Sequence, residues 1–150
     1  ELNSTKIKIY LNKLNEDSNP NWGIMNSSQI YNIVKIHRSI FWNQKNIFRK
    51  QILFRAFFRY FFLQYLKYIE FDITKFKKNS TTLKVFKSYP LSIDFNNEKK
   101  RLIENLNKVQ NIDTKIIQHQ LYGKISSNLF KRLIAFHTSY HFSQFGILSD

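Results

Sequence analysis

Histidines are the first residues of this sequence whose spacing could support chemistry. His137 and His141 lie four residues apart, a separation that can clamp a metal ion from one face of a helix, and His119 lies upstream. No acidic residue accompanies them before Asp150, and no Glu occupies the catalytic position of an H-E-x-x-H motif. We therefore predict no metal site, and we expect these histidines to pack or to contact phosphate.

Carboxylate pairs that could serve as general acid and base are also poorly placed. They fall in expected turns or on exposed helix faces: Glu16 with Asp17, Glu70 with Asp72, and Glu98 with Glu104. With 3 Gly, the chain contains no phosphate-binding loop, no G-x-G-x-x-G and no G-x-S-x-G. The absence of Cys excludes disulfides and thiolate zinc sites. We predict a protein that is not an enzyme, with no catalytic residue, no cofactor and no small-molecule substrate.

The charge distribution points to a polyanionic partner instead. Lys and Arg number 24 against 10 Asp and Glu, which gives a formal net charge of +14 over 150 residues. Acidic residues are missing from two long windows, 18–69 and 114–149, which are rich in cations and aromatic rings. A surface adapted to water usually mixes the two signs of charge. We interpret these windows as surfaces that face the phosphates of RNA, where a carboxylate would be repelled.

A hydrophobic segment at 51–69 allows a second interpretation. It is long enough to cross a bilayer, yet it carries Arg55, Arg59 and Lys67. An Arg near the middle of a membrane helix costs roughly 2.5 to 3.5 kcal/mol, which disfavours a spanning helix. On a helical wheel the two arginines share one ridge, and phenylalanines and tyrosines fill the other sides. Such a helix can bury its aromatic side in protein and present its arginines to phosphates.

The hydrophobic periodicity predicts a single domain over 1–150 that is mainly α. We expect a few helices joined by irregular, extended segments, at most a small β element, and no compact enzyme-like fold. Helices are expected over about 29–41, 46–70, 98–110 and 126–145. Ser27 or Ser28 is expected to cap the first of them, near Gln29, and Gly146 to end the last. Short strands are predicted at 6–11 and 81–90, a loop at 15–23, and an irregular or extended stretch at 111–124.

Composition also suggests an origin. Ala is confined to two positions, and Asn, Lys, Ile, Phe and Tyr, the residues of AT-rich codons, are abundant. An AT-rich organellar genome is a common source of such bias. The N-terminus lacks a secretory signal, and because it does not begin with Met we expect that it is not the translated start.

Residues 114–150 resemble the C-terminal part of the small-subunit ribosomal protein S fourteen family, especially its mitochondrial members. The family pattern begins T-R-I-x-N-R-C-x-x-T-G-R and continues through a basic-aromatic stretch to A-x-x-G-x-L. Matching positions here are Thr114, Lys115 and Ile116 for T-R-I, Gln118 for Asn, Gly123 and Lys124 for G-R, Lys131 and Arg132 in the basic stretch, and Ser143 and Gly146 near the end. The helix expected at 46–69 is similar to the family's N-terminal basic helix. Residues 96–113 would then be an insertion, and about 1–26 an N-terminal extension.

The resemblance implies a structural constituent of the small subunit of a mitochondrial ribosome, located in the matrix. It implies contacts in the subunit head with rRNA and with ribosomal proteins S three, S ten and S nineteen. We expect the following side chains to contact rRNA: Lys45, Arg49, Lys50, Arg55, Arg59, Lys115, Gln118, Lys124, Lys131 and Arg132. The alternative is an accessory subunit of a respiratory complex of the mitochondrial inner membrane, with 51–69 at or in the bilayer.

Overall fold

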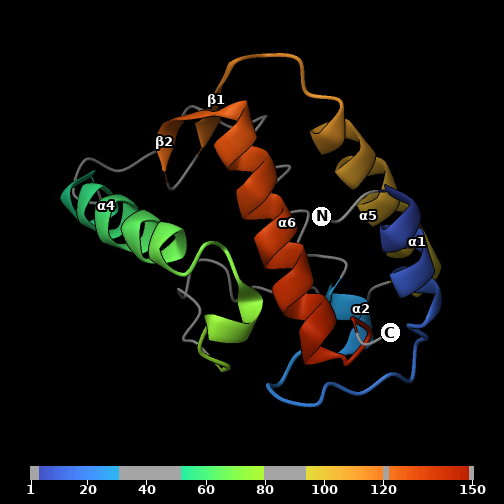
Figure 1. The fold of residues 1–150 in the computed structure, drawn as a ribbon. Coiled ribbons are helices and arrows are strands. Elements are labelled where there is room, and N and C mark those ends of the chain that lie inside the picture. The colour runs from blue at the N-terminus through green and yellow to red at the C-terminus, as the bar shows by residue number, and fades with distance from the viewer. Residues whose placement is uncertain (1–3, 31–51, 80–93, 120–121, 149–150) are drawn as a thin grey trace.

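The computed structural model describes residues 4–30, 52–79, 94–119 and 122–148 (Figure 1). Helices dominate these ranges, and one two-stranded sheet accompanies them. The expectation of a mainly α protein with at most a small β element is therefore confirmed. Three predicted parts lie outside the described residues: residues 31–41 of the helix expected from Gln29, residues 46–51 of the helix expected over 46–70, and the strand at 81–90.

The C-terminal helix α6, Ser127–Gln144, is the central element of the fold (Figure 1). The Ser126 side chain accepts a hydrogen bond from the Leu129 backbone N–H at 3.2 Å and caps its first turn. At its other end the N–H groups of Gly146 and Ile147 donate to the carbonyls of Ser143 and Phe142, which is a Schellman motif. Gly146 has φ +67°, a conformation that Gly adopts without steric cost. The predicted start and stop of this helix are confirmed.

A β-hairpin precedes α6 and packs on it. Strands β1, Ile116–His119, and β2, Gly123–Ser126, pair antiparallel, with Gln118 opposite Lys124. The inward side chains Ile117, His119 and Ile125 are buried. Because strand residues alternate between faces, Gln118 and Lys124 point outward together. Within the stretch 111–124, predicted as irregular or extended, the structure therefore has extended, paired strands at β1 and at the start of β2.

The predicted strand at 6–11 is wrong, because the structure has helix α1, Ser4–Asn12, at this place. Alternating Lys and Ile fit a strand locally, but Ile7, Leu11 and Leu14 also repeat at helical spacing. These three side chains are at most 4% exposed, whereas Ile9 is 54% exposed. Burial against α5, Phe95–Gln110, therefore decides the conformation.

Helix α5 begins three residues before the predicted start. Asp94 caps it, with its carboxylate accepting from the Asn97 backbone N–H at 3.0 Å. Leu102, Leu106 and Val109, which recur at helical spacing, form its buried stripe, and Ile103 is partly buried beside them. The segment that the family resemblance treats as an insertion thus supplies part of the hydrophobic core.

The described residues also form the helices α2, Ser27–Ile30, and α4, Ile52–Tyr68, and the short 3-10 helix η2, Ile73–Lys75. The predicted cap of α2 is wrong, because Asn26 accepts from the Gln29 N–H and the Gln29 side chain accepts from the Asn26 N–H. This reciprocal pair is a capping box. The Ser27 hydroxyl instead donates a hydrogen bond to the Glu16 carbonyl. The expected loop between α1 and α2 is confirmed as turns and bends.

Replacing Phe130 by Ala tests the central role of α6, because this side chain is 0% exposed. We expect Phe130→Ala to lower the free energy of unfolding by about 3 to 5 kcal/mol through lost burial and a cavity. Phe57→Ala is the matched control, since Phe57 is 63% exposed, and should change it by about 0.5 kcal/mol or less. Urea unfolding followed by circular dichroism measures both, and equal losses would contradict this account of the core.

Candidate nucleic-acid interface

The outward face of the hairpin brings together three of the predicted rRNA-contacting residues. Gln118 and Lys124 are directly opposite each other, and Lys115 precedes β1 by one residue. All three side chains are exposed. Below them, the His119 ring lies 6.1 Å from the Phe130 ring of α6, centroid to centroid. The buried inner face thereby fixes the position from which the outer face presents its amide and ammonium groups.

Lys131 has a different role from the one that the sequence suggests. Its ammonium donates to the carbonyls of Gln110 at 2.9 Å and Ile112 at 3.2 Å. These carbonyls lie at and just beyond the C-terminus of α5, where a cation is favoured by the helix dipole. Lys131 therefore ties α5 to α6 and is already engaged within the protein.

Arg132, one residue further, is exposed and lies over an aromatic ring. Its guanidinium carbon is 4.3 Å from the centroid of the Phe71 ring. Phe71 in turn meets Phe136 of α6 edge-on, with ring centroids 6.1 Å apart. Stacking covers one face of the guanidinium and leaves its planar edge of N–H donors for a partner. The sequence did not reveal Phe71 as the support for Arg132.

The turn after α4 places Phe71 in this position. The N–H groups of Glu70 and Phe71 donate to the carbonyls of Lys67 and Leu66, the pattern of a Schellman motif. Glu70 has φ 57° and Phe71 has φ 59°, so two consecutive residues with side chains adopt the left-handed conformation. Each such residue costs on the order of 1 kcal/mol. A sequence without Gly at this position gives no signal for the turn.

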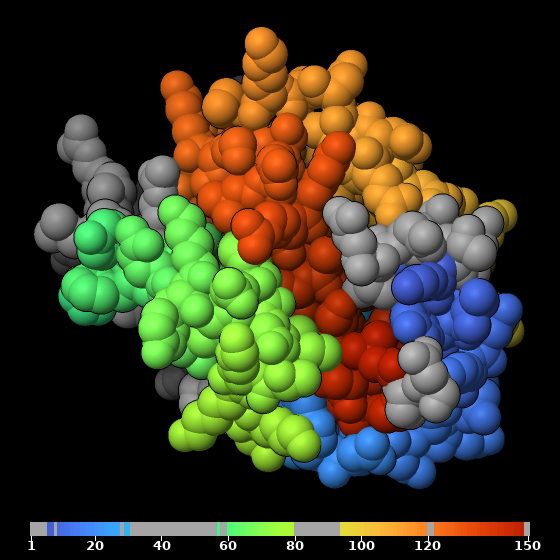
Figure 2. Space-filling model, viewed as in Figure 1, coloured from blue at the N-terminus to red at the C-terminus, as the bar shows by residue number. Residues whose placement is uncertain are grey.

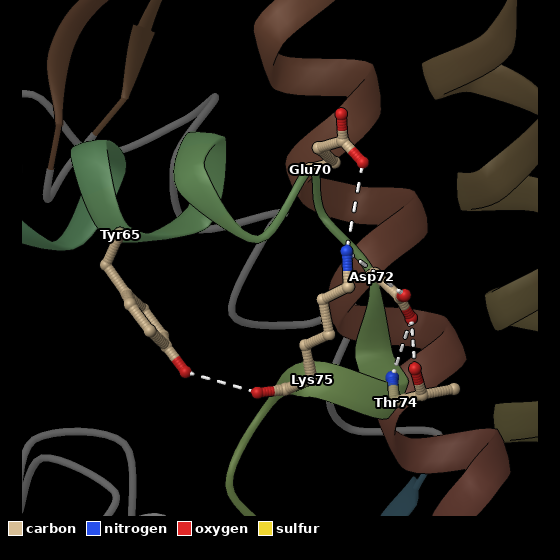
Figure 3. A network of polar contacts seen from close by, with 5 residues as sticks. All are labelled: Tyr65, Glu70, Asp72, Thr74 and Lys75. Atoms are coloured by element: carbon tan, nitrogen blue, oxygen red, sulfur yellow. Dashed lines mark hydrogen bonds and ion pairs between the residues drawn. The ribbon is translucent and has the colours of Figure 1, made fainter.

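A polar network holds the same turn (Figure 3). Lys75 places its ammonium 3.8 Å from the Glu70 carboxylate and 3.9 Å from that of Asp72. Thr74 donates to Asp72 from its hydroxyl at 2.7 Å and from its backbone N–H at 2.8 Å, and these bonds lower the pKa of Asp72. The Tyr65 hydroxyl of α4 donates to the Lys75 carbonyl at 3.4 Å. Both acidic groups of the turn are thus engaged by neighbouring residues.

The other predicted contacts are only partly covered by the structure. Lys45, Arg49 and Lys50 lie outside the described residues. Arg55 and Arg59 lie within α4, where the structure describes their backbone and not their side chains.

Helix α4 also exposes an aromatic face, which we define as Phe57, Tyr60, Phe61 and Tyr68. Among the helices described, none has both the length and the apolar character needed to cross a membrane.

His119 and His141 pack within the protein. Burial lowers the pKa of His119 to about 4, and its Nδ1 accepts from the Tyr122 N–H at 3.1 Å. Burial also lowers the pKa of His141 to about 4, while Gln144, at 3.0 Å from its Nδ1, opposes the shift. Both rings are therefore neutral at pH 7 and add no positive charge. Within the described residues no three His, Cys, Asp or Glu side chains gather in a way that could hold a metal ion.

Comparison with known proteins gives no match: no family model, no curated protein and no solved structure is significantly similar to the chain. The resemblance to the S fourteen family therefore stays a prediction.

The lowered pKa values of His119 and His141 predict a pH-dependent stability. The unfolded chain takes up their protons below pH about 6.5, whereas the folded chain does so only near pH 4. The free energy of unfolding should therefore be at its full value above pH about 6.5 and fall as the pH decreases to about 4, by at most about 3 kcal/mol for each histidine. His119→Asn, which keeps an acceptor for Tyr122, should remove about half of this dependence in urea unfolding. An unchanged dependence would contradict the assignment.

The two kinds of lysine can be separated by substitution. Lys131→Gln should lower the free energy of unfolding by about 1 to 2 kcal/mol, because the carbonyls at the end of α5 lose a charged donor. Lys115→Gln is the control, because this exposed side chain should change stability by about 0.5 kcal/mol or less. Thermal unfolding measures the difference, and equal effects would show that Lys131 does not join the two helices.

Proposed function

We propose that this chain is a structural constituent of the small subunit of a mitochondrial ribosome, where it binds and stabilises rRNA of the head. The observation that carries the proposal is the outward face of the hairpin, with Gln118 opposite Lys124 and Lys115 beside them. This face belongs to a window, 114–149, without any carboxylate, and it is backed by the acid-free helix α6. A phosphate approaching it meets cations and no negative charge from this window.

In this role the protein supports the structure of rRNA through contacts and catalyses no reaction. The ammonium groups of Lys115 and Lys124 and the guanidinium of Arg132 would neutralise phosphates and release their condensed counterions. Gln118 can add neutral hydrogen bonds to sugar or phosphate oxygens, which set register without reading sequence. The buried inner face of the hairpin supports this role, because a fixed strand pair loses little conformational freedom when it binds.

The partners and the location of the protein follow from the family resemblance. They are the rRNA of the small subunit and the neighbouring head proteins S three, S ten and S nineteen, in the mitochondrial matrix. Residues 31–51, which hold Lys45, Arg49 and Lys50, would extend the contact with rRNA.

Sedimentation tests this function. The chain should comigrate with the small ribosomal subunit from mitochondria at low salt and be released by high salt with RNase. The double variant Lys115→Gln/Lys124→Gln should weaken rRNA binding by about tenfold and reduce the slope of log affinity against log salt by roughly one to two. A chain that sediments apart from the small subunit at low salt would contradict the assignment.

One observation favours the alternative, an accessory subunit of a respiratory complex at the inner membrane. The α4 aromatic face leaves large rings in water, with Phe57 at 63% and Tyr68 at 85% exposure. Aromatic rings on a helix whose charged residues are all basic suit the surface of an anionic bilayer. Release from mitochondrial membranes only by detergent, with no effect of salt and RNase, would support this function over the ribosomal one.

A further inference from the structure

A groove of about 1080 Å³ runs along α6 from Ser127 to Ser139, between α1 and the turn at Glu70 and Phe71. The end of α5 closes one side of it. In Figure 2 the surface over α6 lies recessed between the 70–79 segment, in yellow-green, and α1, in blue. None of the contacts on the hairpin face uses this groove.

The groove carries positive charge. Lys6, Lys131 and Arg132 line it, and Glu70 is the one carboxylate among the described lining residues. The Glu70 side chain is 80% exposed and lies 3.8 Å from Lys75, so its charge is partly offset and points to solvent. An anionic group is therefore the complementary ligand for this part of the wall.

Arg132 is already oriented for such a group. Its guanidinium rests on Phe71, which itself stands on Phe136, and all three residues line the groove. Glu70 and Phe71 adopt the strained left-handed backbone conformation at this wall, and this conformation places the Phe71 ring under the Arg132 guanidinium. A planar guanidinium fixed in this way can donate paired hydrogen bonds to a phosphate.

The rest of the lining suits a nucleobase better than an acyl chain. Aromatic walls from Tyr10 and Phe71 alternate with polar side chains such as Asn128 and Ser139. Deeper in the groove the Thr138 hydroxyl is buried without a hydrogen-bond partner among the described residues. A base has flat apolar faces and polar edges, so it can stack on a ring and pair with such groups. A lipid tail would leave the polar groups unpaired.

We propose that this groove binds one unpaired nucleotide of the RNA, with its phosphate at Arg132 and Lys6 and its base between the aromatic walls. This inference rests on the proposed RNA-binding function and adds a single-stranded specificity to it. The hairpin face recognises only backbone charge, so it would not distinguish paired from unpaired RNA. The groove does, because a base within a duplex cannot enter it.

Photo-crosslinking with mass spectrometry and fluorescence anisotropy test the proposal on the full chain. The probes are a short thiouridine-labelled single-stranded RNA and a duplex of the same sequence. We expect crosslinks at Tyr10 or Phe71 with the single strand alone, and Arg132→Gln should weaken single-strand binding by on the order of tenfold. Lys100→Gln removes the same charge from an exposed site outside the groove and should weaken it by about threefold or less.

These experiments distinguish failure of the groove proposal from failure of the proposed RNA-binding function. If RNA binds but crosslinks map only to the hairpin, or Arg132→Gln behaves like Lys100→Gln, the groove proposal is overturned and RNA binding stands. Equal groove crosslinks from the duplex also overturn it. If the wild-type chain binds neither RNA at physiological salt, the proposed function itself fails. Should Arg132→Gln not fold, Ser139→Glu decides, because a carboxylate in the groove must reduce single-strand binding while duplex binding is retained.

Discussion

Burial of α6 is the interaction on which the rest of the structure depends. Phe130 and Phe142 are at most 1% exposed, and other elements meet this helix through aromatic contacts. The hairpin contacts it through His119 and Phe130, α1 through Tyr10 and Phe142, and the turn after α4 through Phe71 and Phe136. Rings suit this task because each buries a large area and can still pack edge-on against several neighbours.

The same helix distributes the positive charge of the protein. Lys131 and Arg132 are adjacent in sequence and diverge by about 100° around the helix. The Lys131 ammonium binds carbonyls at the end of α5, whereas the Arg132 guanidinium stacks on Phe71 at the surface. A net charge of +14 therefore does not mean that every cation is available to a partner. The packing of α6 engages Lys131 within the protein and leaves Arg132 exposed at the surface.

The sequence predicts the local features of the fold well. Ser126 and Gly146 mark the ends of α6, and the apolar stripe of α5 is evident from the spacing of its leucines, because caps and periodicity are local properties. The strand predicted at 6–11 fails because its alternation fits two conformations, and contact with α5 selects the helix. Asn26 and Gln29 carry a capping-box signature that could have been recognised.

The candidate site is less accessible to sequence reasoning. The sequence predicts Lys115, Gln118 and Lys124 as contacts, but their gathering on one face depends on strand register. The stack of Arg132 on Phe71 joins residues far apart in the chain and requires a left-handed turn without Gly. No periodicity encodes such a pair. The groove is likewise formed by residues from separate elements, so its charge and shape emerge only from the tertiary fold.

The antiparallel pairing of β1 and β2 also constrains how this protein can diverge. Gln118 and Lys124 face outward only because Ile117 and Ile125 face inward. Insertion or deletion of a single residue within a strand would exchange the two sets, burying the Gln118 amide in β1 or the Lys124 ammonium in β2 and exposing isoleucine. Homologues should therefore vary the length of this segment between the strands and never inside them.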